Sequence, residues 1–212
     1  GEPTDINAHP HMDASGNIAL IHNGIIENYE TLKQVLIAQG VSFTSDTDTE
    51  VLVQLISTFY YNGESLSFAD AVRAALQDIV GAYGIVAVCA DEPETVVAAR
   101  LGSPLVMGIG EGEYFLASDA SPIVEYTRNV IYLDDGEMVE LTADNHVISE
   151  INSNNILNKK LTEIDLSIEE IEKGEFPYFM LKEIHDQQHS IKDTMRGRLN
   201  FSDGITTLGG IA

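Results

Sequence analysis

The chain has 212 residues, of which 44% are hydrophobic, and this suffices for one sizeable globular domain with a tail. Its 11 Lys and Arg residues oppose 34 Asp and Glu residues, so the formal net charge at pH 7 is -23. A surface this acidic repels nucleic acid and anionic membranes, and no apolar run approaches the roughly 20 residues of a membrane span. The single cysteine, Cys89, excludes an internal disulfide framework, and without a basic-then-apolar leader we expect a cytoplasmic protein.

Helices are predicted in the first part of the chain, after a loop over residues 1–15 and a short apolar strand, Ile18–His22. Asn28 is placed to cap a helix that continues to about Gln39. The segment Thr47-Asp48-Thr49-Glu50 matches the capping box Ser/Thr-x-x-Glu and begins a second helix. Ser67 begins a third.

After Gly81 the hydrophobic period changes to two, which indicates β-strands separated by turns such as Asp134-Asp135-Gly136. The spacing leaves no room for crossover helices, so mainly antiparallel sheets and an α+β fold are predicted. The expected strands are Ile85–Ala90, Thr95–Arg100, Leu105–Ile109, Tyr114–Ser118, Val130–Leu133 and Met138–Leu141.

Residues 151–212 are predicted to lie outside the folded domain, which we place at residues 1–150. From about Ser149 to Gly174 the chain is polar and is typical of a connecting arm. A helix is then expected over Phe176–Leu199, with Pro177 in its first turn and a stripe of apolar residues along one side.

The segment His22-Asn23-Gly24 offers the first candidate site. Asn-Gly after an apolar strand is ordinarily a hairpin turn, but a helix start rather than a returning strand follows here. A strand-to-helix corner with Asn and then Gly suits another role. The Asn amide and the Gly N–H could both donate to a developing oxyanion.

Asp48 is the second candidate. In the first turn of a helix its carboxylate is stabilised by the helix dipole, which alone justifies an acid at this position. The functional alternative is that it accepts a substrate ammonium group, and Asp46 could compete for that role.

His9, His11 and His22 could also be interpreted as a metal site, in which case the chain would be a non-catalytic acidic binding module. The loop position of His9 and His11 offers no obvious register for a third ligand. Cys89 lies within an apolar strand and lacks the small-residue elbow of a strand-to-helix nucleophile, so we expect it to be a buried hydrophobic residue.

Taken in order, segments along almost the whole chain resemble the class II glutamine amidotransferase domain, and most closely that of the glutamine–fructose-6-phosphate aminotransferases, or glucosamine-6-phosphate synthases. His-Asn-Gly and Asp-x-Glu also occur in amidophosphoribosyltransferases and asparagine synthetases, whereas Asn-Ala-His-Pro-His and Gly-Ser-Pro-Leu favour the sugar enzymes. The segments are Gly1-Glu2-Pro3, Asn7–His11, His22–Asn28, Ser45–Val51, Gly81–Gly84, Gly102–Leu105, Ala117–Asp119 and Lys182–His185.

The resemblance implies a four-layer αββα sandwich of the N-terminal-nucleophile hydrolase type and hydrolysis of the L-glutamine side-chain amide without a cofactor or a metal. Asn23 and Gly24 would form the oxyanion hole, and Asp48 would bind the α-ammonium of glutamine. His9 and Gly24 would line the substrate site. Ammonia would pass to a sugar isomerase domain of the same chain, in a parent enzyme that is expected to be a homo-oligomer.

Three features of the resembled family do not occur in these 212 residues: the N-terminal Cys nucleophile, the Arg that binds the glutamine carboxylate, and the segment ending in Thr-His that would precede Gly1. The sugar isomerase domain does not occur in them either. The chain has no basic residue before Lys33, which agrees with a carboxylate clamp located elsewhere. We therefore expect a fragment of a longer enzyme that is inactive by itself.

Overall fold

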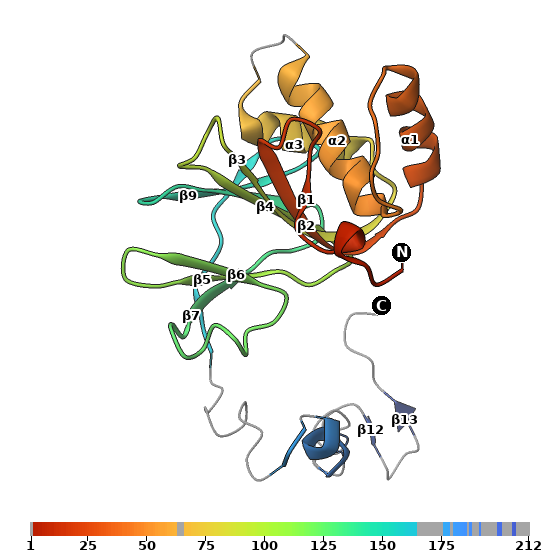
Figure 1. Cartoon of the computed structure of the whole chain (residues 1–212). Helices are drawn as coiled ribbons and strands as arrows, with labels where there is room; N and C mark the ends of the chain where they lie inside the picture. Colours follow the sequence, from red (N-terminus) through yellow and green to blue (C-terminus); the bar gives the residue numbers. More distant parts are fainter. Residues whose placement is uncertain are drawn as a thin grey trace. The chain divides into compact units, whose positions relative to one another are not determined.

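The computed structural model describes residues 2–62 and 66–164, together with residues 176–178, 180–185, 187, 191, 199–200 and 205–206. The chain forms two compact units, Gly1–Asp165 and Leu166–Ala212. The first unit contains the candidate residues (Figure 1). Within the described residues no helix is long and apolar enough to cross a membrane.

Three helices form one layer of the first unit: α1 (Tyr29–Ala38), α2 (Asp48–Tyr61) and α3 (Phe68–Gln77). Thr47 caps α2 by accepting a hydrogen bond from the Glu50 N–H, and Ser67 caps α3 in the same way, as predicted. Asn28 precedes α1 but does not cap it with its side chain. That side chain instead accepts from the Val80 N–H and donates to the Asp78 carbonyl.

Two antiparallel sheets form the next layers, and a short 3-10 helix, Asp5–Asn7, precedes them. Sheet A has the strand order β1-β2-β3-β4-β8-β9-β10, and sheet B has the order β11-β7-β5-β6. Sheet A contains β1 (His11–Met12), β2 (Ile18–Ile26), β3 (Gly81–Cys89), β4 (Val96–Leu101), β8 (Glu137–Leu141), β9 (His146–Glu150) and β10 (Ile156–Leu157). Sheet B contains β5 (Val106–Ile109), β6 (Tyr114–Ala117), β7 (Asn129–Tyr132) and β11 (Thr162–Glu163).

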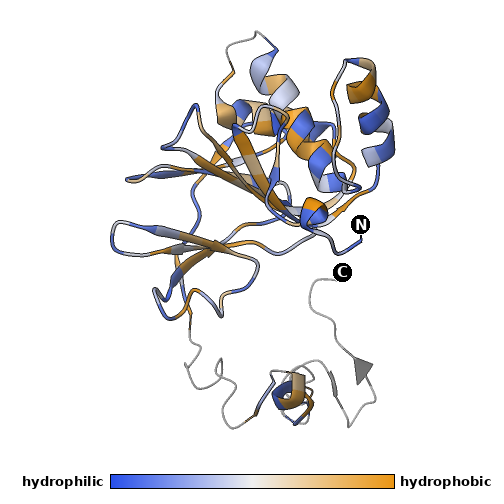
Figure 2. Cartoon of the chain, in the orientation of Figure 1, coloured by the Kyte–Doolittle hydropathy of each residue, from blue (hydrophilic) through white to orange (hydrophobic). Residues whose placement is uncertain are grey.

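Sheet A lies between the helices and sheet B, and a separate apolar core fills each side (Figures 1 and 2). On the helix side, Leu20 and Ile85 pack with Leu52 and Phe68. On the other side, Val139 of sheet A packs with residues of sheet B and its loops, among them Met107, Ile131 and Leu133. The predicted α+β fold with antiparallel sheets is confirmed, and the described residues supply an α, β, β succession of layers.

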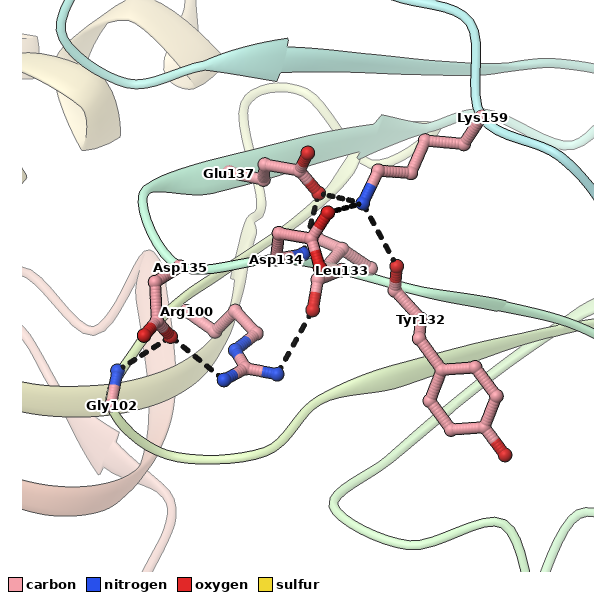
Figure 3. A network of polar contacts seen from close by, with 8 residues as sticks. All are labelled: Arg100, Gly102, Tyr132, Leu133, Asp134, Asp135, Glu137 and Lys159. Carbon is pink, nitrogen blue, oxygen red and sulfur yellow. Dashed lines mark hydrogen bonds and ion pairs between the residues drawn. The ribbon is translucent and has the colours of Figure 1, made fainter. Parts of the chain in front are cut away.

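A polar network joins the two sheets near the end of the first unit (Figure 3). The Lys159 ammonium donates to the Tyr132 carbonyl at 3.1 Å and lies 2.5 Å from Asp134 and 2.7 Å from Glu137. Arg100 and the Gly102 N–H both bind the Asp135 carboxylate, at 2.7 and 2.9 Å. These contacts fix the β7–β8 connection and the chain after β10.

The first compact unit spans Gly1–Asp165, and strands β10 and β11 belong to it, since β10 pairs with β9 and β11 pairs with β7. The division into a domain over residues 1–150 and a connecting arm and helix over residues 151–212 stays a prediction. Strands β10 and β11 were missed because two-residue pairings have no detectable hydrophobic period. Strand β9 was also not predicted.

The second unit tests the predicted helix Phe176–Leu199 only in part. Residues 180–185, 187 and 191 are helical, and most of the remaining predicted residues lie outside the described ones. Leu199–Asn200 is strand β12, which pairs with β13 (Ile205–Thr206), so the helix does not extend to Leu199.

Candidate active site

Asn23, Gly24 and Asp48 line one open cleft of about 450 Å³, between the second half of β2 and the first turn of α2. His9 and His22 line it as well. The structure therefore brings together two candidates that are distant in the sequence, together with the expected lining residue His9.

Asn23 and Gly24 do not form the predicted strand-to-helix corner. Strand β2 continues through them to Ile26, with Asn23 opposite Gly84 and Gly24 opposite Tyr83 of β3. The hairpin interpretation is wrong as well, since β2 does not turn at this point. Both residues are exposed, so they remain accessible to a ligand.

Gly24 occupies a position that excludes any side chain. Its φ is +141°, and a Cβ built there would lie 2.1 Å from the Ala82 carbonyl oxygen. Only glycine allows β2 and β3 to approach this closely. The sequence predicted a close approach of the Gly24 backbone to an oxyanion, whereas the close neighbour in the structure is the backbone of β3. The ligand-facing role of the Gly24 N–H is a separate matter, and it stays a prediction.

Asp48 is the first residue of α2, and its Oδ2 accepts a hydrogen bond of 2.8 Å from the Ile26 N–H. The carboxylate thus connects the helix N-terminus to the end of β2. Its Oδ1 has no hydrogen-bond partner among the residues that the structure describes, so it is available to a cation in the cleft. Asp46 lines the same cleft, where its backbone N–H donates to the Asn7 side chain.

The three histidines of the alternative metal interpretation bind threonine hydroxyls. His9 Nε2 and His22 Nδ1 lie 3.3 and 3.0 Å from Thr49 Oγ1, and His11 Nε2 lies 3.1 Å from Thr47 Oγ1. Burial lowers the pKa of both His11 and His22, which favours their neutral forms. In the described part of the chain, no group of three His, Cys, Asp or Glu residues is placed to hold a metal ion.

Glu50, in the first turn of α2, does not have the capping role that the sequence predicted for it. In a complete capping box its carboxylate would bind the Thr47 N–H. Instead it accepts hydrogen bonds from the backbone and hydroxyl groups of Thr44 and Ser45, at 2.6–3.0 Å. Burial raises the pKa of Glu50, but these hydrogen bonds outweigh burial and lower the pKa overall. The acid therefore anchors the loop that carries Asp46 in front of α2.

A second cavity, of about 290 Å³, adjoins Asn23 between the two sheets. His9, His22 and Asn23 line both cavities, and Leu105 and Leu116 contribute from the side of sheet B. On this face of sheet A, Ile21 is 46% exposed and Ile25 is 68% exposed. Sheet B ends at β6 and leaves this strip of β2 without a covering layer in the described structure.

Cys89 does not belong to the site. Its side chain is 2% exposed and packs in the core between sheet A and the helices, as the sequence predicted.

Comparison with known proteins identifies the family of the chain. The glutamine amidotransferase domain family matches residues 4–125. A curated relative from Chlorobaculum tepidum, named glutamine–fructose-6-phosphate aminotransferase (isomerizing), is 54% identical over 211 residues, which are 100% of this chain and 34% of the relative. A protein of the same name from Bacteroides thetaiotaomicron is 47% identical over 211 residues, again 100% and 34% of the two chains. The chain thus spans about a third of the length of these relatives.

A solved structure supports the fold. The glutamine phosphoribosylpyrophosphate amidotransferase from B. subtilis is 27% identical, with a TM-score of 0.55 over 69% of this chain and 31% of that chain. The family match covers more than half of the present sequence and includes β2 and the first turn of α2. The chain therefore belongs to the glutamine amidotransferase domain family.

Proposed function

We propose that the chain is the glutaminase domain of an enzyme that transfers the amide nitrogen of L-glutamine to fructose 6-phosphate, giving glucosamine 6-phosphate and glutamate. The observation that carries the proposal is the shared cleft of Asn23, Gly24 and Asp48. Two donors for an oxyanion match the side-chain amide of glutamine, and an acceptor for an ammonium group matches its α-amino group. The α-carboxylate would be bound by the Arg that is expected outside these residues.

In the proposed reaction, a cysteine on a segment that precedes Gly1 supplies the nucleophile. Its thiolate attacks the side-chain amide carbon, and Asn23 and Gly24 donate hydrogen bonds to the resulting oxyanion. The proton taken from the thiol passes to the amide nitrogen, the C–N bond breaks and ammonia leaves. Water then hydrolyses the thioester and releases glutamate.

Asp48 binds the α-ammonium of glutamine through Oδ1, while Oδ2 keeps its hydrogen bond to the Ile26 N–H. Neither the attack of the thiolate nor the hydrolysis of the thioester needs a cofactor or a metal. The preceding segment would also cover the exposed strip of β2, because Ile21 and Ile25 offer it an apolar surface. A sugar isomerase domain would take up the ammonia, and a homo-oligomeric, cytoplasmic parent remains part of the proposal.

The experiment compares Asp48→Asn with its neighbour Asp46→Asn in the full chain, with the residues that precede Gly1 restored. Asp48→Asn should lower kcat/KM for glutamine at least about tenfold, because a hydrogen bond to a charged group contributes about 1.5–3 kcal/mol. Asp46→Asn should change it less than about twofold. Ammonia release from glutamine is the measured quantity.

The 212-residue polypeptide alone should release no ammonia, because it contains no N-terminal cysteine. Equal kinetics for the wild type and Asp48→Asn would contradict the ammonium assignment. Activity of the 212-residue polypeptide that Cys89→Ser abolishes would contradict the proposed nucleophile.

A further inference from the structure

Thr49 connects two histidines beneath the cleft. It is the second residue of α2 and is 3% exposed, and its hydroxyl lies within hydrogen-bond distance of both His9 Nε2 and His22 Nδ1. A hydroxyl group carries one donor hydrogen and two acceptor lone pairs, so it can donate to one imidazole and accept from the other. None of the expected site roles includes Thr49.

The contacts of α2 with β2 bracket the candidate oxyanion hole. Thr49 binds His22, which directly precedes Asn23, and Asp48 binds the Ile26 N–H, two positions after Gly24. On its other edge this part of β2 is held against β3, where Gly24 leaves no space for a Cβ. The first turn of α2 therefore contacts the strand on both sides of Asn23 and Gly24.

We propose that Thr49 is a positioning residue, whose hydroxyl holds His22 and thereby sets the place of Asn23 relative to the Asp48 carboxylate. The proposal rests on the proposed function and extends it to Thr49, which lines the same cleft but belongs to neither the oxyanion hole nor the ammonium site. Asn23 and Asp48 must meet opposite ends of one glutamine at the same time. A fixed distance between β2 and α2 satisfies this requirement.

The burial of His22 supports this role. His22 is 7% exposed, and burial lowers its pKa, which favours the neutral imidazole. Its Nδ1 contacts Thr49, while its Nε2 is buried without a hydrogen bond of good geometry. Loss of the Thr49 hydroxyl would leave the buried Nδ1 unpaired, and the ring would then shift or draw in water.

The test uses three variants of the full chain with its preceding residues restored. Thr49→Val keeps the shape of the side chain and removes the hydroxyl, whereas Thr49→Ser keeps the hydroxyl. Thr58→Val is the matched control, because Thr58 lies on the same helix and its hydroxyl, among the described residues, binds only the Gln54 carbonyl, at 2.9 Å. For each protein, kcat and KM for ammonia release from glutamine are measured.

Thr49→Val should lower kcat about tenfold or more with KM within about twofold, since a displacement of about 1 Å can cost up to 10²-fold in rate. Thr49→Ser should restore kcat to within about twofold, and Thr58→Val should behave as the wild type. If the Thr49 hydroxyl served stability alone, Thr49→Val would lower the stability of the protein but leave kcat unchanged. An unchanged kcat in Thr49→Val, or a Thr49→Ser variant as slow as Thr49→Val, overturns the proposal.

The wild-type assay separates this inference from the proposed function. A wild-type full chain that releases no ammonia refutes the function. In that case NMR still decides whether Thr49 positions the strand: Thr49→Val should shift the His22 imidazole ¹⁵N and the Asn23 amide signals, whereas Thr58→Val should leave both unchanged. Unchanged signals in Thr49→Val refute the positioning role.

Discussion

Replacing Gly24 with alanine should destabilise the fold by about 4 kcal/mol. Alanine at a φ of +141° lies in a region that is nearly restricted to glycine, and this strain costs about 1–3 kcal/mol. The new Cβ would also lie 2.1 Å from the Ala82 carbonyl oxygen and 3.0 Å from the Tyr83 Cα. Both atoms belong to the backbone of β3, so the strands must separate. Losing about two hydrogen bonds between β2 and β3 adds about 1–3 kcal/mol.

Gly40→Ala is the matched control, because Gly40 has a φ of +92° but a Cβ there would meet no atom within 4 Å. It should lose only the conformational term, about 1–2 kcal/mol. With about 2–4 °C of Tm per kcal/mol for a chain of this size, Gly24→Ala should melt about 8–16 °C below the wild type and Gly40→Ala about 2–8 °C below it. Thermal unfolding followed by circular dichroism measures both. If the two variants melted at the same temperature, the close approach of β2 and β3 at Gly24 would not contribute to the destabilisation by Gly24→Ala.

Two further predictions concern the site and its support. In the restored full chain, Asn23→Ala should lower kcat for glutamine hydrolysis by about 10²–10³ with little change in KM, and a steep rise in KM at constant kcat would make Asn23 a ground-state binder instead. Glu50→Gln should lower the unfolding free energy at pH 7 by about 1.5–3 kcal/mol, because hydrogen bonds to a charged acceptor are lost. Since the pKa of Glu50 is depressed below its ordinary value of 4.5, its contribution is complete above about pH 4.5 and is lost as the pH falls through the folded-state pKa. Urea unfolding at pH 7 and at about pH 3 should therefore show the difference between wild type and Glu50→Gln shrink, and a difference independent of pH would refute this reasoning.

Local signals in the sequence predicted most of the helices and longer strands correctly. The Thr47 and Ser67 caps work through direct neighbours in the chain, so three or four residues suffice to place them. Strand β3 alternates between more and less buried residues, and β4 to β8 are short apolar runs between turn signals, so these strands could be recognised. The tight turns between them required antiparallel pairing.

Features that depend on partners far away in sequence were not predictable. Asn23-Gly24 has the composition of a turn, but its conformation is set by β3, about 60 residues later. Similarly, His9 and His22 gave no indication that they share Thr49, because the fold alone brings these three residues together. The burial pattern along β2 places His22 on the helix side and Asn23 on the opposite side, but the residues Ile18–Ile26 do not alternate apolar with polar types, so the sequence carried no signal for it.

The register of sheet A connects Asn23 with Lys159, which lies just after the last strand of that sheet. Asn23 lies opposite Gly84, Gly84 opposite Arg100, and Arg100 opposite Glu137, so one transverse row crosses four strands. With about 4.8 Å between neighbouring strands, its ends are roughly 15 Å apart. Lys159 binds Glu137 at the far end of this row, just after β10 (Figure 3). A pull on the chain beyond β11 is therefore borne first by the pairing of β11 with β7, and the ion pair of Lys159 with Glu137 connects the same segment to the row of strands that carries Asn23.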